Sequence, residues 1–289
     1  MCDNEVYTFM TNKVREISNA VANPLGAIEM NAKPRQSADA IFNFMTELWH
    51  LEKVLKNKML SPRYCKENIE YLRIDGLSEI AFPMKCFCDI NLHKLHEHIE
   101  WYGGYAIGLS KRFGREHGIQ PITYLNTGSQ LTNDFEIAFR EALRSEEDCP
   151  VYVNNMKNYL IHQLMYVKPV EGKTYNHSKG EYLHKCLTDE QEWRFVPSFS
   201  MLESIHMKQA IIDKKELDKS VLVLESNSLD GRKECSLEFE YEDIKYILIS
   251  DESELEKLYE TIGQLEISER DKMCLCTKII VWNSWEGDL

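Results

Sequence analysis

The stretch from Glu79 to Asn126 constrains the fold of this 289-residue chain more than any other, because a turn signal separates each of its periodic segments. Alternation of apolar and polar residues is typical of half-buried strands, and a spacing of three to four residues is typical of helices. In order, the block predicts a strand, a helix, a strand, a short helix and a strand over Ile80–Ile90, Leu92–Tyr102, Tyr105–Leu109, Lys111–His117 and Pro121–Leu125. Pro83 lacks a backbone donor, which favours an edge or a bulge for the first strand.

The rest of the chain continues this mixture of short strands and helices. Helices are predicted over Glu47–Lys56, from Asn133, from Pro150 and over Glu252–Ile262. Strands are predicted over Ile41–Met45, Gln163–Lys168, Glu192–Val196, Val221–Glu225, Leu237–Phe239, Lys245–Ser250 and Thr277–Trp282. The polar segments 63–79 and 169–189 are predicted to be loops. We therefore expect one α+β domain over residues 39–289, with a curved mixed or antiparallel sheet and peripheral helices, preceded by an N-terminal extension over residues 1–38.

Composition limits the partners and the compartment. Thirty-four basic and 47 acidic residues give a formal charge of −13, which argues against broad binding of nucleic acid. Lys111, Arg112 and Arg115 are close enough in sequence to form a local basic patch. No stretch has the apolar length of a membrane span, and the N-terminus lacks the basic and then apolar order of a signal peptide. A cytoplasmic protein without membrane contact is expected.

Nine cysteines, an odd number, predict reduced thiols rather than a disulfide framework. Cys86/Cys88 and Cys274/Cys276 have C-x-C spacing, which on strands would put each pair on one face. A site of four thiolates is the alternative if the two strands are neighbours. Because zinc sites usually show C-x2-C spacing, the sequence favours thiols that hold no metal.

Several stretches together resemble the AbiGi family of bacterial abortive-infection proteins. The central pieces are FPMKCFCDI, a helix containing His98, and WYGGYAIGLSKRFGREHGIQPITYLN. Matching pieces also occur in Asp39–Asn68, in EQEWRFV and in FEYEDIKYILIS. One position departs from the family pattern, because Asn43 stands where such proteins usually carry a histidine. The resemblance implies a component of a phage-defence system that acts as an antitoxin-like or regulatory partner, by binding a protein from the same operon.

A weaker resemblance concerns only the order of elements, which is similar to that of ADP-ribosyltransferase-like folds. It implies an alternative function as an NAD-dependent toxin, in which Asn43 and Glu192 would be the catalytic residues. A carboxylate on a rigid strand can stabilise the cationic transition state of ribosyl transfer. NAD would be the cofactor of this alternative, whereas the antitoxin-like interpretation implies no cofactor. The residues placed around the NAD are Asp89, Gly104, Tyr105, Gly108 and Arg194.

Each of these residues also has a structural interpretation. Glu192 and Arg194 lie on the same face of a strand, so they can form an ion pair within the fold. Asn43 can satisfy backbone groups at a strand end, and Asp89 can cap a helix. The glycines can serve turns and close packing. The two interpretations differ in whether Asn43, Glu192 and Gly108 line one cleft.

Overall fold

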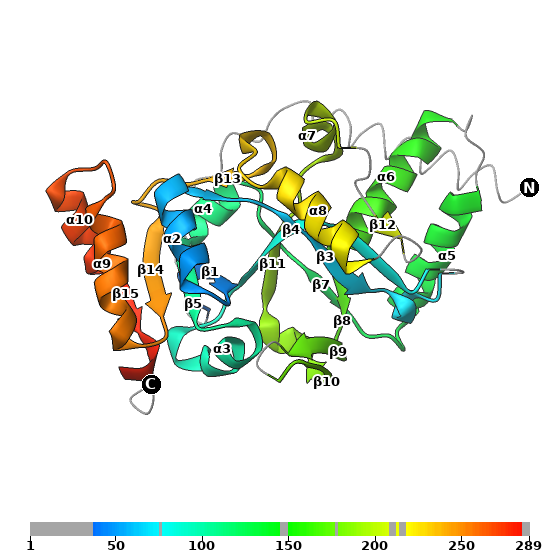
Figure 1. Cartoon of the computed structure of the whole chain (residues 1–289). Helices are drawn as coiled ribbons and strands as arrows, with labels where there is room; N and C mark the ends of the chain where they lie inside the picture. The colour runs from blue at the N-terminus through cyan, green and yellow to red at the C-terminus, as the bar shows by residue number, and fades with distance from the viewer. Residues whose placement is uncertain are drawn as a thin grey trace, which may run out of the picture. The chain divides into compact units, whose positions relative to one another are not determined.

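The computed structural model describes residues 37–74, 77–144, 150–176, 179–207, 212–213 and 218–284. Within these residues the fold is α+β, with helices arranged around a mixed nine-stranded sheet (Figure 1). The extension predicted over residues 1–38 lies outside the described residues, except for Ser37 and Ala38.

The sheet consists of β1 (Ala40–Met45), β3 (Arg63–Asn68), β4 (Glu79–Cys88), β5 (Tyr105–Ser110), β6 (Gln120–Pro121), β11 (Glu192–Phe195), β12 (Ile212–Asp213), β14 (Ile244–Ile249) and β15 (Ile279–Val281). Seven of these strands follow in the order β15-β14-β5-β1-β4-β11-β6, while β3 and β12 also pair with β4. The pairings are antiparallel except that of β14 with β15. The strands predicted around Met84–Cys88, Tyr105–Leu109 and Tyr246–Ile249 are confirmed as members of this one sheet.

The long strand β4 is central rather than peripheral. It pairs with β3 along its first part and with β11 from Lys85 to Cys88. At Pro83 itself, however, β4 pairs only with β3 among the described residues, because β12 pairs with Ile80 and Ala81 and β11 begins at Lys85, so one side of the proline is a local edge, as expected. Tyr64 lies opposite Pro83, and its N–H donates to the Ser226 hydroxyl at 3.0 Å. The ladder thus needs no donor from the proline at this position.

Three further pairs of strands lie outside this sheet: β2 (Met59–Leu60) with β13 (Leu237–Glu238), β7 (Thr123–Leu125) with β8 (Val167–Pro169), and β9 (Glu171–Asn176) with β10 (Glu181–Cys186). Residues 169–189, predicted to be a loop, are thus mainly a hairpin, followed by a 3-10 turn over Leu187–Glu190. Residues 63–79, also predicted to be a loop, contain β3. Both segments are polar, so the apolar alternation on which strand prediction depends is missing.

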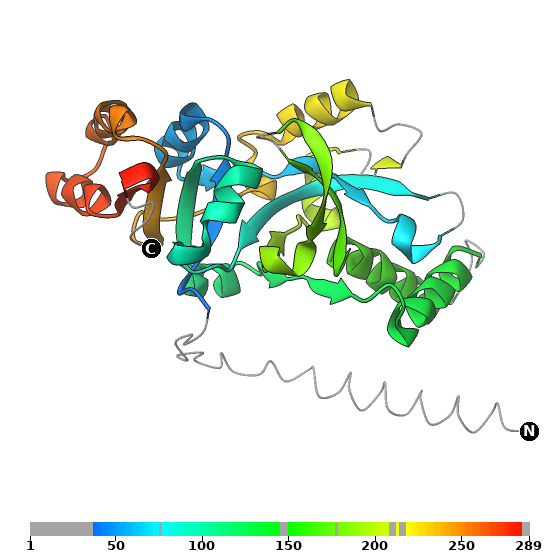
Figure 2. The same ribbon diagram turned by 90° about the horizontal axis from the view of Figure 1, so that it is seen from below.

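The helices are α2 (Leu48–Asn57), α3 (His96–Tyr102), α4 (Lys111–Glu116), α5 (Gln130–Arg144), α6 (Val151–Met165), α7 (Phe199–Ser204), α8 (Lys219–Leu229), α9 (Leu255–Gly263) and α10 (Glu269–Cys276). Figures 1 and 2 place α9 and α10 at one end of residues 37–284 and α5 and α6 at the other.

One predicted strand is helical instead, and another begins later than predicted. Val221–Glu225 lies in α8, where the Asp218 carboxylate caps the first turn by accepting from the Ser220 N–H at 2.7 Å. Most of Gln163–Lys168 continues α6 or follows it, and only its last residues enter β8. A β-branched or apolar run does not separate a strand from a buried helix, and here packing decides.

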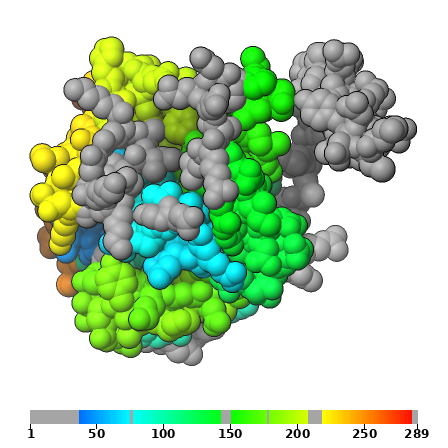
Figure 3. Space-filling view, turned by 90° about the vertical axis from the view of Figure 1, so that its right-hand side faces the viewer, coloured from blue at the N-terminus to red at the C-terminus, as the bar shows by residue number. Residues whose placement is uncertain are grey.

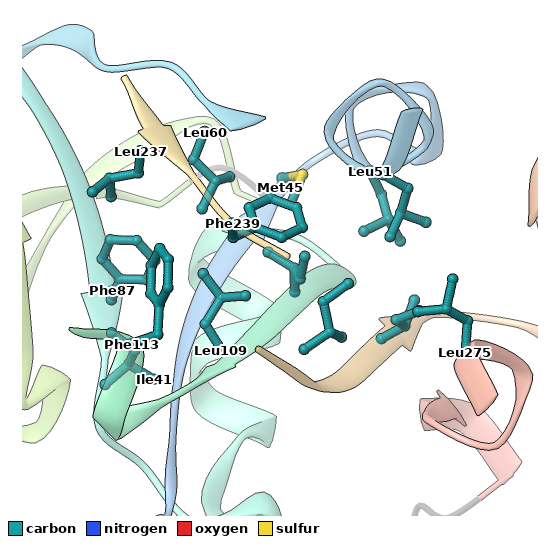
Figure 4. Close-up of a cluster of buried hydrophobic side chains, with 14 of the residues drawn as sticks. Ile41, Met45, Leu51, Leu60, Phe87, Leu109, Phe113, Leu237, Phe239 and Leu275 are labelled. Carbon is teal, nitrogen blue, oxygen red and sulfur yellow. The ribbon is translucent and has the colours of Figure 1, made fainter. Parts of the chain in front are cut away.

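A cluster of buried side chains fills the space between one part of the sheet and the helices α2, α9 and α10 (Figure 4). We call it the apolar core, and its members include Ile41, Leu51, Ile107, Leu258 and Leu275. In α2 the residues Leu48, Leu51 and Leu55 recur at helical spacing and are all buried, which explains why this segment forms a helix here.

Candidate functional site

A cavity of about 330 Å³ lies where β1, β3, β4 and β11 meet α3 and the β8–β9 segment. Its lining includes Phe44, Lys66, His98, Tyr175 and Glu190. Asn43 and Glu192, the two residues proposed as catalytic, both contribute to it as well. The sheet register explains their proximity, because Phe42 on β1 and Glu192 on β11 both pair with Cys88 of β4, from its two sides.

Arg194 organises the polar end of this region. Its side chain is 0% exposed. The guanidinium donates to both carboxylate oxygens of Glu192, at 2.6 and 3.2 Å, and to Glu67 Oε1 of β3 at 2.9 Å. A further bond, at 2.8 Å, goes to the Met165 carbonyl oxygen at the end of α6. Strand periodicity put Glu192 and Arg194 on one face, and the structure shows them ion-paired there.

Lys168 continues the network on the side of the cavity. Its ammonium donates to Glu190 at 2.8 Å and to Glu192 at 2.9 Å. Glu190 also accepts from the Tyr102 hydroxyl and from Lys185, the latter at 3.2 Å. The Lys185 ammonium lies 4.6 Å from the centre of the Trp101 ring, a cation–π distance.

We call the six charged residues the charge cluster: Glu67, Lys168, Lys185, Glu190, Glu192 and Arg194. Three cations thus face three carboxylates, so the cluster carries no net charge when all six are ionised. Burial alone would raise the pKa of Glu192, but Arg194 and Lys168 outweigh it and hold this pKa far below its usual range. The carboxylate is therefore ionised at neutral pH and has no proton to donate.

An aromatic wall adjoins the charge cluster and is formed by Phe44, His98 and Tyr102. The His98 ring lies 5.7 Å from that of Phe44 and 5.5 Å from that of Tyr102, centre to centre. Burial, with a smaller contribution from Lys185, lowers the pKa of His98 to about 4. The imidazole at this wall is therefore neutral at physiological pH.

Asn43 lines the cavity and carries a buried acceptor without a partner. Its side-chain nitrogen donates to the Cys86 carbonyl oxygen at 2.8 Å, which orients the amide. The residue is only 6% exposed, and its buried Oδ1 has no hydrogen-bond partner. A buried carbonyl oxygen without a partner is costly in a folded protein. This atom is thus a place where a donor from a bound molecule would be stabilising.

The other residues predicted to bind a cofactor lie away from the cavity lining. The Asp89 carboxylate pairs with Lys111 at 2.6 Å, and the Tyr105 hydroxyl donates to Glu254. A side chain at Gly104 would meet Ser250, and one at Gly108 would meet the Phe42 ring. Both glycines therefore allow close packing of the protein on itself, and neither is among the residues that line this cavity. The part of these four residues in cofactor binding stays a prediction.

The predicted basic patch also changes in the structure. Lys111 is buried against Asp89 and the Ser37 hydroxyl, so its charge is neutralised inside the fold. Arg112 lies at the surface near Glu116. These contacts leave no group of three exposed cations in α4.

The two C-x-C pairs are not related as the metal alternative requires. Cys86 and Cys88 lie on β4, but Cys274 and Cys276 lie in α10, a helix that the sequence did not predict. Within the described residues, no group of three or more His, Cys, Asp or Glu side chains is arranged to hold a metal. A hydrogen bond links the thiols of Cys65 and Cys86; this bond lowers the pKa of Cys65 and raises that of Cys86.

Sequence reasoning missed four of the six residues of the charge cluster. Glu67 comes from the predicted loop 63–79 and Lys185 from the predicted loop 169–189. Lys168 ends the predicted strand Gln163–Lys168, and Glu190 directly follows the second loop, in the 3-10 turn. One available signal was the pair of short polar segments on either side of Gly180, whose φ of +70° suits a tight turn. That pattern predicts a hairpin even without apolar alternation.

Comparison with known proteins gives two matches. Residues 57–250 match a family model described as "Putative abortive phage resistance protein AbiGi, antitoxin". The chain is also 32% identical, over 249 residues, to the abortive phage resistance protein AbiGi of Lactococcus lactis subsp. cremoris. The aligned region covers 78% of this chain and 98% of that protein. No solved structure matches the chain, so the likeness to ADP-ribosyltransferase folds gains no support. Among the described residues, no helix is long and apolar enough to cross a membrane.

Proposed function

Because the chain belongs to the AbiGi family of abortive phage resistance proteins, we propose that it acts as an antitoxin by binding a toxic protein from the same defence operon. Such a role requires no reaction at the antitoxin itself. A complex that covers the working surface of the toxin lowers the concentration of free toxin in proportion to its affinity.

The observation that carries this proposal is the solvent-facing side of α6, which we call the α6 outer face and define as Tyr152, Met156 and Tyr159. These residues are spaced i, i+4 and i+7, so they share one side of the helix. Their exposed fractions are 60%, 55% and 56%. An adjoining side of α6 is buried through Leu160 and Leu164, so apolar residues continue from the buried side of the helix onto its exposed side.

The neighbouring helix α5 also carries exposed apolar residues, Leu131 and Ile137, both more than half exposed. Figure 3 shows α5 and α6, in green, on the face of the molecule presented there. Exposed apolar residues gathered on one element mark protein interaction sites more often than isolated ones do. Tyrosine and methionine are also enriched in such interfaces. Both helices fall within residues 57–250, the part that matches the family model.

The charge of the chain indicates the kind of toxin that it would bind. A formal charge of −13 repels acidic partners and attracts cationic ones over several ångströms. Complementary charge raises the rate of encounter and disfavours wrong partners. A toxin with a basic surface around an apolar groove therefore fits this antitoxin best.

Co-expression with the adjacent operon protein tests the proposal. The wild-type chain should co-purify with that protein and restore growth of cells that produce it. A double variant, Met156→Asp with Tyr159→Asp, should lose both effects and keep its melting temperature, because the substituted residues are exposed.

A matched control is Leu224→Asp, which places the same charge at an exposed apolar residue of α8. This variant should still bind the partner and protect growth. Retained binding by the α6 variant would exclude the α6 outer face as the interface. If the wild-type chain neither binds nor protects, the antitoxin proposal is wrong.

A further inference from the structure

We propose that the cavity between the aromatic wall and the charge cluster binds a nucleoside, or the nucleoside part of a larger nucleotide. The base would lie along the aromatic wall, and the ribose would lie at the carboxylates of Glu190 and Glu192. This site is separate from the α6 outer face and does not depend on the antitoxin proposal.

The base is accommodated by the row of rings from Phe44 through His98 to Tyr102. Planar heteroaromatic bases gain stability by stacking on such side chains. A neutral imidazole in the row is compatible with an uncharged base, and the low pKa of His98 keeps it neutral. The volume of about 330 Å³ is at the small end of ligand pockets, which suits a nucleoside better than a complete dinucleotide.

The edge of the base is recognised by Asn43. Its Oδ1 is buried without a partner in the free protein, and its amide nitrogen is already engaged by the Cys86 carbonyl oxygen. Only one of its two N–H donors is accounted for by that bond, and the acceptor Oδ1 is the atom that stays unsatisfied. An exocyclic amino group, as in adenine or cytosine, supplies the missing donor.

The ribose is recognised by the lone pairs that the charge cluster leaves unused. Glu190 accepts from Tyr102, Lys168 and Lys185, and Glu192 accepts two bonds from Arg194 and one from Lys168. A carboxylate offers about four acceptor positions, so each keeps about one. A vicinal pair of ribose hydroxyls matches two such acceptors, and carboxylates bind ribose hydroxyls in this way in other folds.

Phosphate groups are not expected to reach the charge cluster, because each of its cations already has a carboxylate partner. Lys66 is different, since it lines the cavity while its side chain is 38% exposed and pairs with Glu79. A 5′-phosphate would therefore extend toward Lys66 at the edge of the cavity.

Calorimetric titration of the purified wild-type chain tests the proposal with a graded set of ligands. Adenosine should bind, whereas purine riboside, which lacks the amino group, should bind roughly 3- to 10-fold more weakly for the loss of one hydrogen bond. 2′,3′-Dideoxyadenosine should lose at least as much, because it lacks both hydroxyls. These comparisons need no variant and so cannot be confused with misfolding.

Two variants locate the site. Asn43→Ala should weaken adenosine binding and abolish the difference between adenosine and purine riboside. The double variant of the α6 outer face should bind adenosine as the wild type does. The proposal is overturned if adenosine and cytidine do not bind at millimolar concentrations, or if binding ignores both the amino group and the hydroxyls. It is also overturned if Asn43→Ala, shown to be folded by its circular dichroism, preserves the preference for the amino group.

Discussion

The apolar core and the charge cluster are built on the same sheet but hold their strands together in opposite ways. The apolar core joins β1, β5 and β14 to α2 and α9 through side chains such as Leu51, Ile107 and Leu258, all fully buried. The charge cluster joins β3, β11 and the end of α6 through a single buried guanidinium.

This difference determines how each region responds to change. In the apolar core, stability is spread over many weak contacts, and the loss of one side chain leaves a cavity. In the charge cluster, a few groups in low dielectric balance one another, and the loss of one leaves a charge without its partner. The first region tolerates substitutions of similar volume, whereas the second tolerates only those that keep the charges matched.

The largest effect is expected from Glu192→Ala. The change leaves the three cations of the charge cluster, Arg194 and Lys168 among them, with only two carboxylates. Breaking a buried ion pair in this way costs about 3–5 kcal/mol of unfolding free energy. Chemical denaturation followed by circular dichroism measures this loss. Leu51→Ala in the apolar core should cost a similar amount, about 2–5 kcal/mol, by leaving a cavity.

The two variants differ in how they can be rescued. A double variant with an apolar residue at position 192 and methionine in place of Arg194 should recover much of the lost stability. The charges that remain without their partners, Lys168 and Glu67, lie nearer solvent than the pair that was removed. No second charge change should rescue Leu51→Ala. If Glu192→Ala keeps the stability of the wild type but loses defence activity, Glu192 has a functional role rather than a structural one.

A smaller effect concerns pH and His98. The unfolded chain takes up a proton at His98 near pH 6.5, but the folded chain resists it until about pH 4, so the unfolded state binds more protons between these values. Stability should therefore fall as the pH is lowered from 6.5 to 4, by about 3 kcal/mol over the whole interval. His98→Phe should flatten this slope.

Denaturation between pH 6.5 and 5 separates this effect from that of the carboxylates. Glu190 and Glu192 have lowered pKa values in the fold, so their stabilising contribution is lost only below the ordinary glutamate pKa of about 4.3. An unchanged slope in His98→Phe would show that another group is responsible. The apolar core contributes no slope in this range, and Leu51→Ala should keep the wild-type profile.

The smallest effect compares two glycines. An added Cβ at Gly108 would lie 2.8 Å from the Phe42 ring and 3.2 Å from the Tyr246 Cβ, so Gly108→Ala should cost about 1–3 kcal/mol by overpacking. Gly263→Ala is the control, because nothing lies within 4 Å and helix propensity favours alanine by up to about 1 kcal/mol. Thermal denaturation of both variants should show shifts of opposite sign. A Gly108→Ala variant of normal stability that no longer supports defence would instead restore the ligand-binding role predicted for this glycine.

Those parts of the fold that bury apolar side chains could be predicted from the sequence. The alternation over Ile80–Ile90, Tyr105–Leu109 and Lys245–Ser250 located β4, β5 and β14, because each strand faces an apolar cluster on at least one side. Period two also placed Glu192 and Arg194 on one face of β11. Both signals depend only on local geometry and on burial, which the sequence pattern records directly.

The remainder of the site depends on contacts that local pattern does not record. Lys185 and Glu190 lie in polar segments, and Lys168 ends an apolar run. Their charged side chains become buried only because they meet partners of opposite charge. Nor does local spacing show that Asp89 and Lys111 form a buried pair. Gly108 looked like a place for ligand approach, but the Phe42 ring from the neighbouring strand occupies the space.

The contacts of Arg194 also have a consequence for the order of folding. Its partner Glu67 is 127 residues away along the chain, and its bond to Met165 spans 29. The guanidinium gains from these partners only after β3, β11 and the end of α6 have come together and excluded water. We expect such contacts to form late, after the transition state. Their loss should therefore accelerate unfolding far more than it slows folding, so that Arg194 sets how long the native protein persists rather than how fast it is reached.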